Sequence, residues 1–181
     1  MIPISDLRLR VILVVVISLG LACLGGCSKP TDRQRPNDAQ SPALNVRSSA
    51  DVVKVSTPNL SISVGGKADA IIALSISPGY HVNANPATFD YLIATNVTAG
   101  KSEGLSTGKP VYPAAEKKKF QFAEAPLAVY EGEVQIKLPL TAAANASGVR
   151  SLPVDVRVQA CDQEKCFPPD TLHTTLAVEV K

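Results

Sequence analysis

The sequence of 181 residues has no tryptophan, few aromatic residues (4%), two histidines and four cysteines. Because residues 51–181 also lack two widely separated cysteines, a true antibody-like domain with its buried Trp and inter-sheet disulfide is excluded. The histidines, His81 and His173, do not form the close second pair that a zinc site with two cysteines usually shows, so no metal is predicted. A net charge of +2 gives no basic footprint for nucleic acid, and no motif indicates a cofactor.

No stretch sustains a 3.6-residue apolar stripe, although residues 141–144 favour one helical turn. Instead, short segments alternate apolar and polar residues between Pro, Gly and Asn, a pattern typical of strands and turns. Strands are predicted at 53–55, 60–64, 68–76, 80–82, 91–94, 134–140, 154–158 and 172–180. About seven strands at this spacing predict an all-β, antiparallel sandwich of immunoglobulin type over residues 51–181.

The beginning of the chain is typical of an export signal. Arg8 and Arg10 precede an apolar run at 11–24, and its length of about 14 residues is short of the roughly 20 that a membrane-spanning helix needs. The run ends in Leu-Gly-Gly-Cys27, which resembles the bacterial lipoprotein processing box. We therefore predict a signal peptide over 1–26 and lipid on Cys27, the alternative being an ordinary secretory signal with an incidental cysteine.

Residues 27–50 are predicted to form a flexible tether. The segment contains Pro, Ser, Gln and charged residues but almost no apolar residue before Leu44, so it cannot bury a core. Together, the export signal, the lipid on Cys27 and the tether predict a location in the bacterial cell envelope, with the domain facing the periplasm or the exterior. Once Cys23 has left with the signal and Cys27 carries lipid, Cys161 and Cys166 are the two remaining thiols in an oxidising compartment.

Cys161 and Cys166 lie at the predicted tip of a hairpin formed by 154–158 and 172–180, where Pro168 and Pro169 interrupt pairing. A disulfide there closes a ring of six residues, which contributes roughly 2 kcal/mol, against about 4–5 kcal/mol for a ring near 100 residues. Spacing alone leaves two interpretations open: a bridge that only orders the loop, and an exchangeable pair.

Five segments together resemble a known family. They are Pro-Gly-Tyr-His-Val-Asn at 78–83, Tyr-Leu-Ile at 91–93, Val-Tyr-Pro at 111–113, Val-Tyr-Glu-Gly at 129–132, and Gln-Ala-Cys-Asp-Gln-Glu-Lys-Cys-Phe-Pro-Pro at 159–169. Their order and spacing resemble the N-terminal periplasmic domain of the DsbD-type thiol:disulfide interchange proteins, over essentially all of residues 51–181. The resemblance implies an immunoglobulin-like fold whose cysteine pair passes electrons from a membrane thiol reductase to periplasmic thioredoxin-like proteins.

Matched by position, Cys161 and Cys166 are the exchanging pair, and the resemblance implies that Cys161 makes the mixed disulfides that Cys166 resolves. The family covers its cysteines with an aromatic cap loop, for which Phe120 and Phe122 are the candidates, although core packing would also explain either one. Tyr80 and His81 match a segment near the family's site. A structural role is the alternative for His81.

Full-length members of this family continue into a membrane domain and a thioredoxin-like domain, whereas this sequence ends at Lys181, so the expected electron donor is a separate protein. Lys165 favours a neighbouring thiolate, while Asp162 and Glu164 oppose it, which suits a specific carrier better than a promiscuous oxidoreductase. Two hypotheses follow. The chain is a lipid-anchored thiol:disulfide carrier, or it is a lipid-anchored immunoglobulin-like binding module with a structural disulfide.

Overall fold

The computed structural model describes residues 45–181. The predicted signal peptide, the lipidation site at Cys27 and most of the predicted tether lie outside the described residues. Within 45–181, no helix is long and apolar enough to span a membrane.

The described residues form a 3-10 helix, η1, followed by strands of two to eleven residues. Their bounds are η1 Ser49–Asp51, β1 Val53–Ser56, β2 Leu60–Ile62, β3 Lys67–Ile76, β4 His81–Asn83, β5 Asn96–Ala99, β6 Leu105–Thr107, β7 Glu116–Lys118, β8 Leu127–Tyr130, β9 Glu133–Ala142, β10 Gly148–Val158, β11 Ala160–Cys161 and β12 Asp170–Val180.

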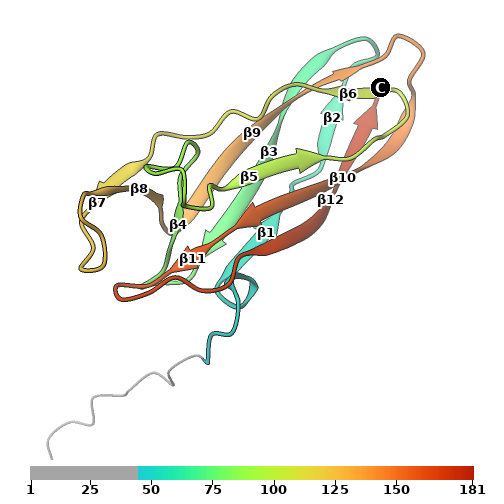
Figure 1. Cartoon of the computed structure of the whole chain (residues 1–181). Coiled ribbons are helices and arrows are strands. Elements are labelled where there is room, and N and C mark those ends of the chain that lie inside the picture. The colour runs from blue at the N-terminus through green and yellow to red at the C-terminus, as the bar shows by residue number, and fades with distance from the viewer. Residues whose placement is uncertain (1–44) are drawn as a thin grey trace, which may run out of the picture. The chain divides into compact units, whose positions relative to one another are not determined.

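Two four-stranded sheets, in the orders β1-β3-β9-β6 and β2-β12-β10-β5, form the sandwich (Figure 1). Neighbouring strands are antiparallel except β2, which runs parallel to β12. Along each long strand, alternate side chains are buried, as expected for one face on the core. The core joins both sheets through buried residues that include Ile72, Leu74, Ile136, Leu138, Leu152, Val154, Leu176 and Val178. The predicted all-β, antiparallel, immunoglobulin-like fold is thus confirmed.

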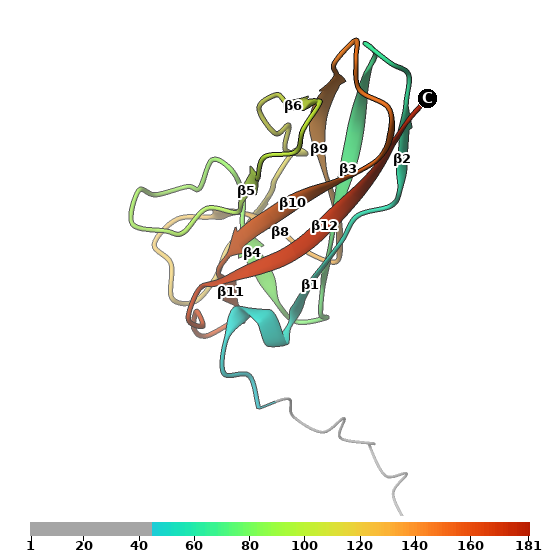
Figure 2. The ribbon, with the colours of Figure 1, turned by 90° about the vertical axis from the view of Figure 1, so that its right-hand side faces the viewer.

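A third sheet, in the order β11-β4-β8-β7, lies at the end of the sandwich away from the C-terminus (Figures 1 and 2). The long hairpin of β10 and β12 runs toward this end, with Val154 paired to Thr174 and Val158 to Asp170. That hairpin was predicted, and the third sheet was not. Because β11 directly follows β10, the third sheet receives the cysteine segment as its edge strand.

The strand predicted at 91–94 is wrong, because that segment is a loop and the next strand, β5, begins at Asn96. Two side-chain amides explain the difference. Asn83 Nδ2 donates to the Ile93 carbonyl at 3.1 Å, and Asn85 Nδ2 donates to the Thr95 carbonyl at 2.9 Å. These bonds replace the strand partner that a ladder would provide. The helical turn favoured at 141–144 is also absent from the described chain, since β9 continues to Ala142.

Candidate functional site

The two cysteines form a disulfide at the tip of the β10–β12 hairpin, with a Cα–Cα distance of 3.9 Å. The four residues between them make a tight turn, in which the Asp162 N–H donates to the Lys165 carbonyl at 2.9 Å. The Asp162 carboxylate accepts from the amides of Glu164 and Lys165, both at 2.8 Å. Partial burial acts to raise the pKa of Asp162, but these two amides outweigh it and hold the pKa below its usual value. Asp162 therefore organises the turn as an anion.

The two halves of the disulfide differ in exposure. Cys161 is fully buried in β11, where it pairs with β4, whereas Cys166 is exposed. A partner's thiolate can therefore approach Cys166 but not Cys161. This geometry favours Cys166 for the mixed disulfides, whereas the family resemblance gives them to Cys161. The physical reason is that β11 enters the third sheet, so its cysteine is covered by neighbouring strands while the return arm stays outside.

His81 lies directly opposite Cys161 in the antiparallel pair of β4 and β11. Directly paired residues project from the same face of a sheet, so the imidazole and the Cys161 side chain are cross-strand neighbours. The His81 ring is 1% exposed and stacks on Phe120, with ring centroids 4.0 Å apart. Its Nε2 finds no hydrogen-bond partner among the residues that the structure describes.

Burial lowers the pKa of His81 below its ordinary value. The nearby carboxylates of Glu131 and Asp162 act to raise it, and Lys118 acts to lower it further. Lys118 itself is bonded to Glu131, which raises the pKa of Lys118 and neutralises part of the field of that carboxylate. At neutral pH the residue facing Cys161 is therefore an uncharged imidazole.

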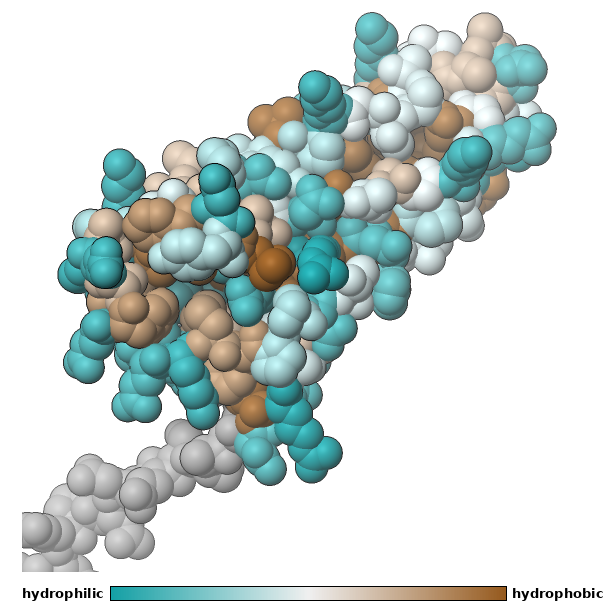
Figure 3. Space-filling view, viewed as in Figure 1, coloured by the Kyte–Doolittle hydropathy of each residue, from teal (hydrophilic) through white to brown (hydrophobic). Residues whose placement is uncertain are grey.

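The candidate cap residues, Phe120 and Phe122, lie on the β7–β8 hairpin and differ in burial. Phe120 is 2% exposed and packs with Leu127 and Val129, so it reaches the site through its stacking on His81. Phe122 stacks on the outer side of Phe120, with centroids 5.5 Å apart, and is 41% exposed. Figure 3 shows apolar side chains interspersed with hydrophilic ones over this end of the sandwich.

Tyr80, the fourth candidate neighbour, contacts the return arm of the hairpin. Its ring centroid lies 5.8 Å from that of Phe167, the residue after Cys166, and Lys165 Nζ lies 5.5 Å from the same Phe167 ring centroid. Tyr80 and His81 thus flank the two arms separately: Tyr80 supports the Cys166 arm and His81 faces the Cys161 arm.

Sequence reasoning missed Ser49, which it placed in the tether. Ser49 is fully buried, its Oγ donates to the Pro168 carbonyl at 2.8 Å, and the same oxygen accepts from the Ala160 N–H at 2.8 Å. Packed structure therefore begins before the predicted boundary at Asp51. The available signal was Ser48, three residues before Asp51 and just ahead of an alternating strand, the spacing of a capping box at the start of a helical turn.

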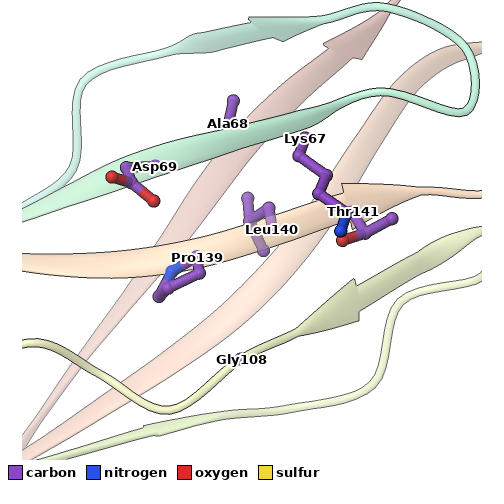
Figure 4. Close-up of a pocket in the computed structure, with 7 residues that line it drawn as sticks. All are labelled: Lys67, Ala68, Asp69, Gly108, Pro139, Leu140 and Thr141. Carbon is purple, nitrogen blue, oxygen red and sulfur yellow. The ribbon is translucent and has the colours of Figure 1, made fainter.

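A groove on the sandwich lies far from the cysteines. It is lined by β3, β9 and the segment after β6, and Figure 4 shows Lys67, Asp69, Pro139 and Thr141 around it. No cysteine or histidine is among the residues that line it. Within residues 45–181, no group of three or more His, Cys, Asp and Glu side chains could hold a metal ion.

Comparison with protein families finds a match over residues 49–177 to the family described as thiol:disulfide interchange protein DsbD, N-terminal. A search of curated proteins finds no match.

Solved structures with similar folds include the Neisseria meningitidis DsbD N-terminal domain in the reduced form, at 17% identity and a TM-score of 0.43, covering 71% of this chain and 85% of that one. A complex of the N-terminal domains of DsbD and PilB from the same organism matches at 16% identity and a TM-score of 0.45, covering 77% of this chain and 88% of that one. A type I cohesin of ScaB from Pseudobacteroides cellulosolvens matches at 12% identity and a TM-score of 0.45, covering 72% of this chain and 92% of that one.

Proposed function

Because this chain belongs to the family of DsbD N-terminal domains of thiol:disulfide interchange proteins, we propose that it is a thiol:disulfide exchange carrier that acts through Cys161 and Cys166. The observation that carries the proposal is the unequal exposure of the two cysteines in one short disulfide ring. An exposed Cys166 gives a partner access, and a buried Cys161 next to it supplies the second sulfur within the same fold.

The carrier accepts electrons by attack on Cys166. A donor thiolate bonds to the Cys166 sulfur, the Cys161–Cys166 bond breaks, and Cys161 leaves with the electron pair and takes up a proton. A second donor thiolate then attacks the donor sulfur of the mixed disulfide, which releases the donor as a disulfide and leaves Cys166 as a thiolate. Two electrons have moved and the carrier is a dithiol.

The carrier passes the electrons on by the reverse chemistry. The Cys166 thiolate attacks an acceptor disulfide and releases one acceptor thiolate. Cys161, once deprotonated, attacks the Cys166 sulfur and expels the second acceptor thiolate, which restores the ring. In this order Cys166 makes the mixed disulfides and Cys161 resolves them, the opposite of what the sequence resemblance implied.

The partners follow from the same family resemblance. The donor is a membrane thiol reductase and the acceptors are periplasmic thioredoxin-like proteins. The chain works as a lipoprotein of the bacterial envelope: residues 1–26 direct export, Cys27 carries lipid, a tether follows, and the redox domain faces the periplasm or the exterior. A tether suits this role because it lets an anchored carrier reach both a membrane donor and diffusing acceptors.

The proposal is tested by trapping intermediates in cells. In Cys161→Ser, Cys166 forms mixed disulfides that have no intramolecular exit, so adducts accumulate on non-reducing gels of acid-quenched cells and mass spectrometry identifies the partners. The matched variant Cys166→Ser leaves only a buried thiol and should form few adducts. The potential of the native pair should lie above roughly −300 mV, below which structural disulfides fall.

Two outcomes would argue against it. Adducts confined to Cys166→Ser would restore the order of attack implied by the resemblance. No adducts from either variant, together with a potential well below that level, would leave the immunoglobulin-like binding module with a structural disulfide as the better account.

A further inference from the structure

The hydroxyl of Ser49 joins the two arms of the redox hairpin. It accepts from the N–H of Ala160, the residue before Cys161, and donates to the carbonyl of Pro168, two residues after Cys166. The Ser49 N–H donates to the same Pro168 carbonyl at 3.1 Å. Figure 2 shows η1 beside β11 and the hairpin end, so one buried oxygen from the start of the domain touches both cysteine arms.

The arms have few other bonds to each other at this level. Regular pairing of β10 with β12 ends at Val158 and Asp170. Beyond it, the Phe167 N–H donates to the Ala160 carbonyl at 2.8 Å and Gln159 Nε2 donates to the Phe167 carbonyl at 3.3 Å. Within the turn, the Asp162 N–H donates to the Lys165 carbonyl. Pro168 and Pro169 have no N–H to donate. The serine therefore supplies the cross-link that the proline segment cannot.

We propose that Ser49 is a positioning residue for thiol:disulfide exchange, which holds the arms of Cys161 and Cys166 together when the disulfide is open. This inference rests on the proposed function of the pair. Ring closure requires the Cys161 thiolate to reach the Cys166 sulfur, and its rate and equilibrium rise with the time the two sulfurs spend in reach. The hydrogen bonds of Ser49, unlike the disulfide, survive reduction and keep the two sulfurs near each other.

Removal of the hydroxyl should favour the dithiol. The Ala160 N–H loses its partner and the Pro168 carbonyl loses one of two donors, and a buried N–H without a partner is costly. In the disulfide form the closed ring holds both arms in place, so the Ala160 N–H stays buried without a partner. In the dithiol form the open ring lets the arms move, so this N–H can bond to water. The disulfide form is therefore destabilised more than the dithiol form.

The test compares Ser49→Ala with Asp51→Ala in the full chain. Asp51 holds the same turn by accepting from the amides of Arg47 and Ser48, at 2.7 and 3.0 Å, and those bonds leave the hairpin untouched. Each protein is equilibrated in glutathione buffers and the fraction of dithiol is measured. For Ser49→Ala we expect the equilibrium to shift about tenfold toward the dithiol, which corresponds to about 30 mV for this two-electron couple. Asp51→Ala should match the wild type.

An unchanged equilibrium in Ser49→Ala would overturn the proposal, even if the variant is less stable, since a structural serine would weaken both redox forms alike. An equal shift in Asp51→Ala would also overturn it, because the effect would then belong to the turn and not to the hydroxyl. Failure of the carrier function itself looks different: the wild-type pair would resist reduction in the same buffers.

Discussion

Reduction of Cys161–Cys166 should leave the fold nearly as stable as before. The β10–β12 ladder extends from Gly148–Val180 to Val158–Asp170 without help from the disulfide. The ladder belongs to one of the two core sheets, and the disulfide lies beyond its last pair, Val158–Asp170. A reduced Cys161 remains a small, buried, apolar side chain in β11, which suits its surroundings. The perturbation is thus confined to the loop between the arms.

The magnitude follows from ring size. The bonded cysteines are five positions apart, and the chain-entropy relation gives about 2 kcal/mol for such a ring at 25 °C. By the thermodynamic cycle, this is also the amount by which folding favours the disulfide over the dithiol. For a two-electron couple it corresponds to a potential about 45 mV more negative in the folded than in the unfolded chain. A difference this small keeps the pair within reach of biological thiols.

The assay is urea denaturation of the oxidised protein and of the protein kept in excess reductant. The double variant Cys161→Ala/Cys166→Ala is a control that cannot reoxidise. We expect both the reduced protein and this variant to lose about 2 kcal/mol or less of unfolding free energy. A loss above about 4 kcal/mol would refute the reasoning, because a bond of that strength in so short a ring would have to hold the hairpin itself together.

Two further predictions concern the anchor and the buried imidazole. Cys27→Ser should move the protein from the membrane to the soluble envelope fraction with an unchanged circular dichroism spectrum, and retention on membranes after a high-salt wash would contradict lipidation at Cys27. Because burial lowers the pKa of His81 in the folded state, the unfolded chain binds the proton first as pH falls, so unfolding free energy should decline below about pH 6.5 by up to about 1.4 kcal/mol per pH unit. His81→Gln should remove this part of the acid dependence and the exposed control His173→Gln should keep it; equal slopes in urea titrations of all three proteins would show that His81 is not its source.

Much of the sandwich could be predicted because its long strands alternate apolar and polar residues. In β3, β10 and β12 the buried side chains follow the period of two, and each strand has one face on the core. The third sheet could not be predicted in this way. The residues of β4 are all buried and those of β7 are charged, so neither shows alternation. Their pairing depends on contacts between distant segments.

The site likewise contains residues that the sequence could predict and others that depend on contacts between distant segments. The cysteines, the proline segment and the neighbours Tyr80 and His81 could be named from the sequence, because they lie in matched segments. Phe120 could be named only as a candidate, from its place in the loop before the segment at 129–132. The sequence could not predict which cysteine is exposed. Burial of Cys161 requires the pairing of β11 with β4, some 80 residues earlier in the chain. Ser49 was missed for the same reason. Its partners, Ala160 and Pro168, lie more than 100 positions away.

In the proposed exchange, the burial of Cys161 places the source of specificity in the partner. When Cys166 is attacked, the departing Cys161 thiolate forms in a site where burial disfavours charge and where the facing His81 is neutral. The neutral imidazole brings no positive charge to the anion, and the carboxylates of Asp162 and Glu164 lie nearby on the turn. A small thiol that attacks Cys166 brings nothing to offset this cost. A protein partner covers the turn with its own surface, and can offer a proton, a hydrogen-bond donor or a positive charge. The arrangement therefore selects partners by the surroundings they bring to the leaving sulfur, and Cys166 can stay exposed without being open to every thiol.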